Sequence, residues 1–332
     1  MDKARVGVVV IGRNEGERLR RCLLSAADAQ SRVYVDSGST DGSQALAREL
    51  AFEVVDLDTS RGFTAARARN AGLDHLVRSG VALDYVQFVD GDCELRSGWL
   101  KQALGDFTPE RAAVFGRRRE RHPERNLYHR ACDREWTVPQ GEVSSCGGDV
   151  LFRLKALRQV DGYNDALIAG EEPELCLRLR QKGWRIYCNA REMTWHDVAI
   201  DRIGQWWLRA KRTGYGFGVL VSLHGKDEPS WNRLLLSAVC WSALMLALPL
   251  ALLASVVTSS PIFLALALGL GLLLVAGIVR TAWRERRSFS GIGKAIQWSA
   301  LLYLSKLAQA QGLLEQRWKR MRSSPDRIIE YK

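Results

Sequence analysis

The seven cysteines of this chain include no CxxC pair and no zinc-finger spacing. Cysteines paired at short spacing mark zinc sites and disulfide scaffolds, so their absence argues against both and suits a reducing compartment. The chain also lacks internal repeats and low-complexity linkers. Its 332 residues are enough for one large α/β domain with an appendage.

The N-terminal segment lacks the features of a secretory signal peptide. The apolar run in "MDKARVGVVVIGRNEGE" is too short for the hydrophobic core of such a peptide, and it has no small-residue cleavage site. We therefore expect this run to form a first β-strand.

Charge is missing from a long stretch, because no Lys, Arg, Asp or Glu occurs in the 46 positions between Arg233 and Arg280. A membrane-spanning helix needs about 20 apolar residues, so this stretch is long enough for two. The sequence "TSSP" at 258–261 separates them. We expect a transmembrane hairpin of helices over 234–257 and 262–279; the alternative is a buried helical hairpin of a soluble protein.

The positive charge is concentrated at the C-terminal end. The net charge is +11, and the segment 280–332 alone contributes a surplus of 8, with 12 Lys/Arg against 4 Asp/Glu. The rest carries only +3, which argues against a nucleic-acid groove in the folded domain. Arginines crowd "RTAWRERRS" after the second span, so the positive-inside rule places this segment and the N-terminal domain in the cytoplasm. Residues 291–314 are expected to form an interfacial helix, with a third span as the alternative.

Residues 1–110 alternate between strand-like and helix-like patterns. "VGVVVIG", "RVYVDSG", "FEVVDL" and "DYVQFVD" are apolar runs typical of strands, and amphipathic segments separate them. This rhythm predicts an α/β fold with a mainly parallel sheet. Polar pairs follow three of the strands: Asn14-Glu15, Asp36-Ser37 and Asp90-Gly91-Asp92. Ligands of such sheets bind outside the carboxyl ends of the strands, so these clusters are expected at one edge.

Asp90 and Asp92 are two like charges that end a buried strand. Two carboxylates one residue apart can coordinate a hard divalent cation such as Mg²⁺ or Mn²⁺. Such a cation can bridge a diphosphate and neutralise charge on a leaving group. The alternative is an Asp-Gly-Asp turn that only caps a helix.

Six segments occur in an order that resembles a known family. They are "VVVIGRNEGERLRRCLLS", "VYVDSGSTDGS", "GFTAARARNAGL", "FVDGDCEL", "GGDVLFRLKALRQVDGYND" and "GEEPELCLRLRQKGW". Together they resemble the family 2 glycosyltransferases of the GT-A fold, over about residues 5–220. The resemblance implies transfer of a sugar from a nucleoside diphosphate with inversion at the anomeric carbon.

By the same resemblance, several residues are expected to bind the nucleotide-sugar. Asn14 and Glu15 follow the first strand, where the family contacts the nucleotide, although Asn14 is also a good helix N-cap. Asp36 corresponds to the acid that contacts the base or ribose, and "SGSTDGS" reads equally well as a turn. The remaining contacts, near the diphosphate, the donor sugar and the acceptor, are expected from Arg69, Asn70, Asp90, Gly148 and Asp149.

The resemblance also assigns a metal site and a catalytic base. Asp90 and Asp92 match the metal motif, and His196 lies where some members carry a histidine that completes the site; the alternative is a structural histidine. "GEEPELCLRL" resembles the family's "GEDxDLxLR", in which the second acid is the base. Glu172 is therefore expected to take the proton of the acceptor hydroxyl. Glutamate replaces the usual aspartate, so Glu171 stays an alternative base.

These features predict a GT-A domain over 1–222, a linker over 223–233, two transmembrane helices within 234–280 and a basic cytoplasmic tail over 281–332. We expect an inner-membrane enzyme that uses a nucleoside-diphosphate sugar, a divalent cation and a lipid-linked saccharide acceptor in cell-surface or exopolysaccharide assembly. No nucleic-acid partner is expected.

Two other classes stay open as alternatives. One is a non-catalytic membrane scaffold with a degenerate transferase domain. The other is a nucleotidyltransferase, although "VVVIGRNEGE" lacks the repeated glycines of a phosphate loop. "QWWLRAKRTGYG" departs from the "QxxRW" signature of processive synthases, which argues against a processive polymerase.

Overall fold

The structure is a computed structural model that describes residues 4–322. The chain divides into two compact units. The first comprises residues up to Arg125 together with Cys132–Ala199, and the second comprises Asn126–Ala131 and the residues from Ile200 on. Residues 1–3 of the expected domain 1–222 and residues 323–332 of the expected tail 281–332 lie outside the described residues.

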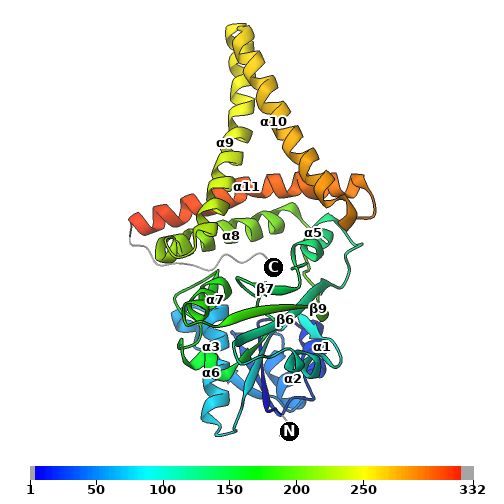
Figure 1. Cartoon of the computed structure of the whole chain (residues 1–332), viewed down its shortest axis with the longest axis vertical. Coiled ribbons are helices and arrows are strands. Elements are labelled where there is room, and N and C mark those ends of the chain that lie inside the picture. The colour runs from blue at the N-terminus through cyan, green and yellow to red at the C-terminus, as the bar shows by residue number, and fades with distance from the viewer. Residues whose placement is uncertain (1–3, 323–332) are drawn as a thin grey trace. The chain divides into compact units, whose positions relative to one another are not determined.

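The first unit is built on one sheet with the strand order β3-β2-β1-β4-β8-β6-β9-β5, and β7 also pairs with β9 (Figure 1). The run β3-β2-β1-β4 is parallel, as expected. Beyond it the sheet is mixed, because β8 lies antiparallel between β4 and β6. The strands are β1 (Val6–Gly12), β2 (Ser31–Asp36), β3 (Glu53–Asp56), β4 (Tyr85–Asp90), β5 (Cys93–Leu95), β6 (Arg111–Glu120), β7 (Gly141–Val143), β8 (Val150–Arg153) and β9 (Arg185–His196).

Helices pack on this sheet through apolar positions one turn apart. In the first helix, for example, Leu19, Cys22 and Leu23 are buried against the core. Gly72 lets the third helix approach β1, since a Cβ there would lie 2.4 Å from Val9. The helices are α1 (Glu17–Ser25), α2 (Ser43–Glu49), η1 (Thr59–Arg61), α3 (Ala65–Arg78), α4 (Trp99–Gly105), α6 (Leu154–Arg158) and α7 (Glu171–Gln181), while α5 (Leu127–Glu135) has residues in both units.

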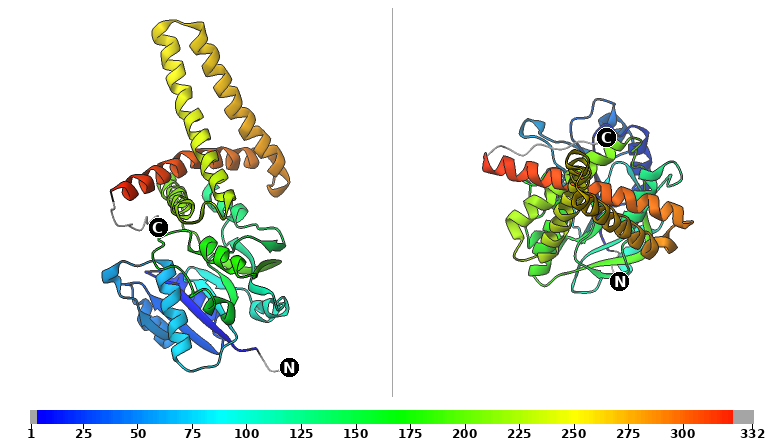
Figure 2. Two further views of the ribbon diagram at one scale, coloured as in Figure 1. Left: turned by 60° about the vertical axis from the view of Figure 1, so that its left-hand side comes forward. Right: turned by 90° about the horizontal axis from the view of Figure 1, so that it is seen from above.

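The second unit is helical. It contains α8 (Ile203–His224), α9 (Pro229–Thr258), α10 (Pro261–Glu285), η2 (Arg286–Ser288) and α11 (Ile292–Met321). Helix α8 packs along α11, and α9 and α10 form a hairpin (Figure 2). Two glycines allow the close contact of α8 with α11. A Cβ on Gly214 would lie 2.0 Å from the Gln309 carbonyl oxygen, and a Cβ on Gly312 would lie 2.0 Å from the Lys211 carbonyl oxygen.

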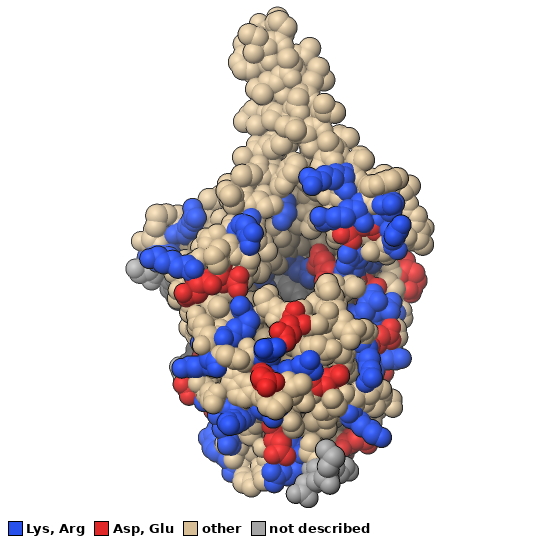
Figure 3. All heavy atoms as spheres, viewed as in Figure 1, with Lys and Arg blue, Asp and Glu red and all other residues tan. Residues whose placement is uncertain are grey.

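The hairpin confirms the two apolar helices expected from the sequence, with the turn at 258–261. Among the described helices, Pro229–Thr258 and Pro261–Ser288 are long and apolar enough to cross a membrane. Only 11% and 6% of their most apolar stretches are buried, which argues against the alternative of a soluble-protein core. Figure 3 shows the outer part of the hairpin without charged side chains and several basic ones near its base.

Candidate active site

The carboxyl ends of β1, β2 and β4 lie side by side in the sheet. Gly12 pairs with Asp36 on one side, and Ile11 pairs with Asp90 on the other. The polar residues that follow these strands therefore share one edge, as the sequence predicts. Gly91 sits close to this junction, since a Cβ there would lie 3.0 Å from the Ile11 carbonyl oxygen and 3.3 Å from the Glu15 side chain.

Arg69 of α3 joins three of the predicted carboxylates. Its Nη2 lies 2.9 Å from Oδ1 of Asp90, and its Nη1 lies 3.2 Å from Oε1 of Glu171 and 3.1 Å from Oε1 of Glu172. The Arg69 side chain is only 3% exposed. A buried guanidinium among three acids is electrostatically costly to remove, because the acids would be left unpaired. Arg69 thus links the end of β4 to the start of α7.

A second arginine completes the surroundings of Asp90. Nη2 of Arg118 lies 3.2 Å from Oδ2 of Asp90 and 2.9 Å from Oδ2 of Asp149. Asp149 also accepts hydrogen bonds from the Asp90 backbone N–H at 3.0 Å and from the Thr194 hydroxyl at 2.8 Å. Gly148 leaves room for this cluster, since a Cβ there would lie 2.3 Å from Nη2 of Arg69 and 2.8 Å from Oδ2 of Asp90.

The pKa values of Asp90 and Glu172, at the two ends of this network, are shifted in opposite directions. Burial alone would raise the pKa of Asp90, but the Arg69 and Arg118 guanidiniums outweigh it and hold that pKa well below its usual range. Burial, together with the neighbouring Glu171 carboxylate, raises the pKa of Glu172 to about 7, against the opposing effect of Arg69. Glu172 is therefore a carboxyl group that can exchange a proton near neutral pH.

Asp92 and His196 form a separate buried pair beside this network. Oδ2 of Asp92 lies 3.2 Å from Nε2 of His196, and both side chains are nearly buried. Burial lowers the pKa of His196. One carboxylate oxygen and one imidazole nitrogen at this separation are a donor set that Mn²⁺ or Mg²⁺ can accept. Ligand atoms of Asp92, Cys93 and His196 all lie within 4.8 Å of one another.

Asn14 and Asp36 organise the loop that follows β2. The Asn14 side-chain oxygen accepts the Thr40 N–H at 2.7 Å. Asp36 accepts the backbone N–H groups of Gly38 and Ser39 and the Tyr34 hydroxyl. Burial would raise the pKa of Asp36, yet these hydrogen bonds lower it. Asp36 therefore has the turn-forming contacts that were expected as its alternative, at the edge where a nucleotide is expected. The alternative for Asn14, a helix N-cap, is wrong, because the N-cap residue of α1 is Gly16.

Asn70 faces a different part of the unit. Its side-chain amide donates to the Tyr163 carbonyl oxygen at 2.8 Å and to Asp165 at 2.7 Å, and its oxygen accepts the Tyr163 N–H at 2.9 Å. These contacts fasten α3 to the loop that precedes α7. The structure thus brings Arg69, but not Asn70, into the carboxylate network.

Three residues of this region were not predicted from the sequence: Arg118, Cys93 and Glu120. Arg118 stands in the run "GRRRE" of β6, where successive side chains point to opposite faces. Arg117 and Arg119 contact Asp133, whereas Arg118 contacts Asp90 and Asp149. The alternation of side chains along β6 could have indicated that Arg118 faces away from Arg117 and Arg119. The sequence could not identify its partners Asp90 and Asp149, because they are far from Arg118 along the chain.

Comparison with known proteins identifies the family and the fold. A model of glycosyl transferase family 2 matches residues 7–153, and a model of glycosyl transferase family group 2 matches residues 125–279. The mannosyltransferase PcManGT from Pyrobaculum calidifontis, solved with GDP-Man and Mn²⁺, superposes with a TM-score of 0.60 at 17% identity. The superposition covers 96% of this chain and 88% of that one, which shows the GT-A fold.

Two relatives are similar in sequence. The pre-mycofactocin glycosyltransferase of Mycobacterium tuberculosis (strain ATCC 25618 / H37Rv) is 30% identical over 207 residues, which is 58% of this chain and 42% of that protein. The succinoglycan biosynthesis protein ExoA of Rhizobium meliloti (strain 1021) is 26% identical over 206 residues, which is 56% of this chain and 58% of that protein. The chain thus spans about half the length of these relatives. The two family models together extend from residue 7 to residue 279, and the chain belongs to the family 2 glycosyltransferases.

Proposed function

We propose that the chain is an inverting glycosyltransferase that moves a sugar from a nucleoside-diphosphate sugar to a lipid-linked acceptor. The observation that carries this proposal is Glu172, whose carboxyl group has its pKa raised to about 7 and contacts Arg69, which also contacts Asp90, two residues before Asp92 of the cation donor set. Both features stand at the strand edge where ligands of such sheets bind.

Glu172 is the proposed general base. Its side chain is 17% exposed whereas that of Glu171 is 6% exposed, so Glu172 is the more accessible to an acceptor. In the reaction, the Glu172 carboxylate takes the proton of the acceptor hydroxyl while the hydroxyl oxygen bonds to the anomeric carbon. The bond from that carbon to the diphosphate breaks on the opposite face, and the nucleoside diphosphate leaves with the electron pair.

Asp92 and His196 are the proposed cation ligands. A bound Mn²⁺ or Mg²⁺ would neutralise the charge that develops on the diphosphate. The contacts of Asp90 with Arg69 and Arg118 favour a supporting role for this carboxylate, which keeps two cationic groups at the same edge. Asn14, Glu15, Asp36, Gly148 and Asp149 border the same edge and are the proposed surroundings of the donor.

The proposed location is the cytoplasmic face of the inner membrane, in cell-surface or exopolysaccharide assembly. The exposed apolar hairpin supports insertion into a bilayer, and the basic residues that follow it support a cytoplasmic base. Helix α11 extends beyond the expected 291–314 to Met321. It exposes apolar side chains one or two turns apart near both ends, which supports an interfacial position: Ile292, Ile296, Leu314, Trp318 and Met321.

The test is a donor screen with purified full-length protein in detergent. UDP-, GDP- and dTDP-sugars are supplied with Mn²⁺ and a membrane lipid extract, and release of nucleoside diphosphate is measured. We expect release with one donor class, abolition of this release by EDTA, and loss of release in Asp92→Ala.

Two results would contradict the proposal. A folded Asp92→Ala protein with full activity would exclude the cation site. Wild-type protein that binds a nucleotide-sugar but transfers it to no extracted acceptor would favour the alternative of a non-catalytic membrane scaffold.

A further inference from the structure

Glu120 is a fully buried carboxylate that the proposed chemistry leaves without a role. It is the last residue of β6, and its side chain is 0% exposed. Oε1 accepts the His122 backbone N–H and Oε2 accepts the Val198 backbone N–H, each at 3.2 Å. A buried charge is costly, so a carboxylate at this position needs an explanation.

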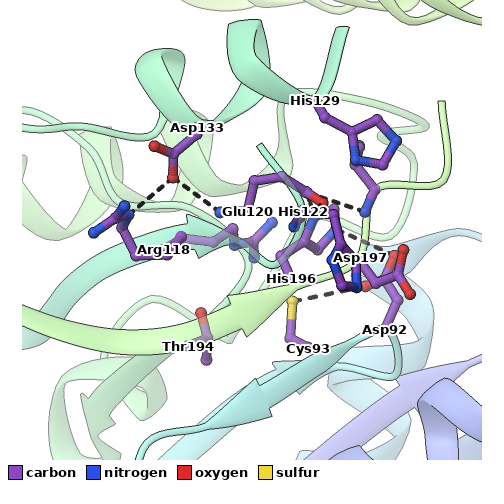
Figure 4. Close-up of polar contacts among 12 residues, drawn as sticks. Asp92, Cys93, Arg118, Glu120, His122, His129, Asp133, Thr194, His196 and Asp197 are labelled. Atoms are coloured by element: carbon purple, nitrogen blue, oxygen red, sulfur yellow. Dashed lines mark hydrogen bonds and ion pairs between the residues drawn. The ribbon is translucent and has the colours of Figure 1, made fainter. Parts of the chain in front are cut away.

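The strand pairing places Glu120 beside His196. Strands β6 and β9 run parallel with Glu120 and His196 as register partners, while Cys93 of β5 is the partner of His196 on its other side. Nδ1 of His196 lies 3.7 Å from Oε2 of Glu120. Figure 4 shows Glu120, His196 and Asp92 gathered above Cys93. The Trp136 ring packs edge to face with the imidazole, with ring centroids 4.5 Å apart.

Each of the two ring nitrogens of His196 lies near a different carboxylate, Nε2 near Asp92 and Nδ1 near Glu120. Nε2 lies 3.2 Å from Asp92, whereas the buried Nδ1 has no hydrogen-bond partner within 3.5 Å among the described residues. A neutral imidazole carries a single proton, so one nitrogen donates and the other offers a lone pair. A nitrogen that binds a cation must offer its lone pair, and the proton then belongs on the other nitrogen.

We propose that Glu120 is a positioning residue for His196, holding its proton on Nδ1 so that Nε2 offers a lone pair on the Asp92 side. This inference rests on the proposed cation site. Closing the gap from 3.7 Å to a hydrogen bond of about 2.9 Å requires a movement of only about 0.8 Å. The hydrogen bonds from the His122 and Val198 backbone N–H groups hold the carboxylate in place, with Oε2 as its nearer oxygen to Nδ1. Such outer carboxylates set the tautomer and orientation of metal-bound histidines.

The first measurement is the affinity of the purified full chain for Mn²⁺ alone, from the electron paramagnetic resonance signal of free Mn²⁺. We expect Glu120→Gln to bind Mn²⁺ about 10- to 100-fold more weakly than wild type. The matched control is Glu174→Gln, which neutralises another buried carboxylate; its partner Arg178 lies on α7, 2.7 Å away. This control should keep wild-type affinity within a factor of about two.

The second measurement separates positioning from mere packing. The ¹⁵N spectrum of histidine-labelled protein reports the tautomer of each imidazole, and the chain has only five histidines to assign. With diamagnetic Mg²⁺ bound, wild-type His196 should carry its proton on Nδ1, and Glu120→Gln should lose this preference. If Glu120→Gln does not fold, the wild-type spectrum still decides, since a proton on Nε2 in the Mg²⁺-bound state would overturn the proposal.

The outcomes distinguish this inference from the proposed function. If His196→Ala weakens Mn²⁺ binding while Glu120→Gln binds like wild type, only the role of Glu120 is overturned. If wild-type protein takes up no Mn²⁺, or if His196→Ala binds it equally well, the cation site itself is wrong and the role of Glu120 falls with it.

Discussion

The two compact units place their polar and apolar side chains in opposite environments. In the first unit, Val9 and Leu23 are fully buried, and so are the charged groups Asp36 and Glu120. In the hairpin of the second unit, Leu253 is 61% exposed, and the charged residues of the hairpin lie outside the uncharged stretch 234–279. A protein in water cannot expose so many apolar side chains at little cost, whereas a hairpin in lipid can. The comparison teaches that the first unit is stabilised by its apolar core and keeps its buried charges at the candidate site, while the hairpin exposes an apolar surface that is compatible with a bilayer.

The largest effect tests whether the buried charge of the first unit serves catalysis. Glu172→Gln keeps the size of the side chain but removes the proton acceptor, so kcat should fall about 10²- to 10⁴-fold while donor affinity changes little. Glu171→Gln should cost about tenfold if this residue only tunes its neighbour. Nucleoside diphosphate release measures both. The opposite ranking would assign the base to Glu171, and full activity in both variants would remove the pair from the mechanism.

The next effect compares the same truncation in the two units. Leu23→Ala removes a fully buried side chain of α1 and should lower the free energy of unfolding by about 2–5 kcal/mol. Leu253→Ala in α9 removes a side chain that is 61% exposed, so the change should stay within about 0.5 kcal/mol. Urea unfolding of the full chain in detergent measures both. Equal losses would mean that the hairpin is packed as a protein core and would break the comparison.

A smaller effect examines the packing around the buried charges. Gly148→Ala would place a Cβ 2.3 Å from Nη2 of Arg69, so the chain must shift, at a cost of about 1–3 kcal/mol of unfolding free energy. The neighbouring Gly147 faces open space, and Gly147→Ala is the matched control with an expected change within about 0.5 kcal/mol. Thermal unfolding of both variants tests this, and indistinguishable stabilities would show that the network yields easily.

The smallest effect is the pH dependence that burial imposes on the base. A base acts only when deprotonated, and the pKa of Glu172 is raised to about 7, so the rate should fall about tenfold for each pH unit below 7. The rate should level off above that pKa. The residual activity of Glu172→Gln should lack this limb of the profile. A wild-type rate that is constant from pH 5.5 to 8 would contradict the raised pKa.

The fold was predictable where the pattern is local. Apolar runs and amphipathic segments indicate β1 to β4 with their crossover helices, and the uncharged stretch indicates the hairpin. The placement of β8 between β4 and β6 has no local signal, because it depends on pairing between strands far apart in the sequence. The mixed half of the sheet therefore became clear only in the structure.

The site residues also differ in whether a local sequence pattern predicts them. Asp92 lies two residues after the end of β4, and Glu172 lies in the first turn of α7. Both belong to family motifs, so their neighbourhood could be expected. Arg118 and Glu120 come from a strand without such a motif. Their partners are Asp90 of β4, Asp149 just before β8, and His196 of β9. Asn70 shows the reverse case, since it shares a motif with Arg69 but points to the loop at Tyr163 because adjacent helical residues face different directions.

The close approach of Gly148 to Arg69 has a consequence for how this protein can change over generations. A Cβ at position 148 would lie 2.3 Å from Nη2 of Arg69, so a larger residue at 148 requires the Arg69 guanidinium or the backbone to move. A lineage that enlarges residue 148 before it shortens residue 69 therefore passes through an intermediate that is less stable than either end point. In a set of homologous sequences, the two positions should vary jointly, with any residue larger than glycine at 148 accompanied by a shorter one at 69.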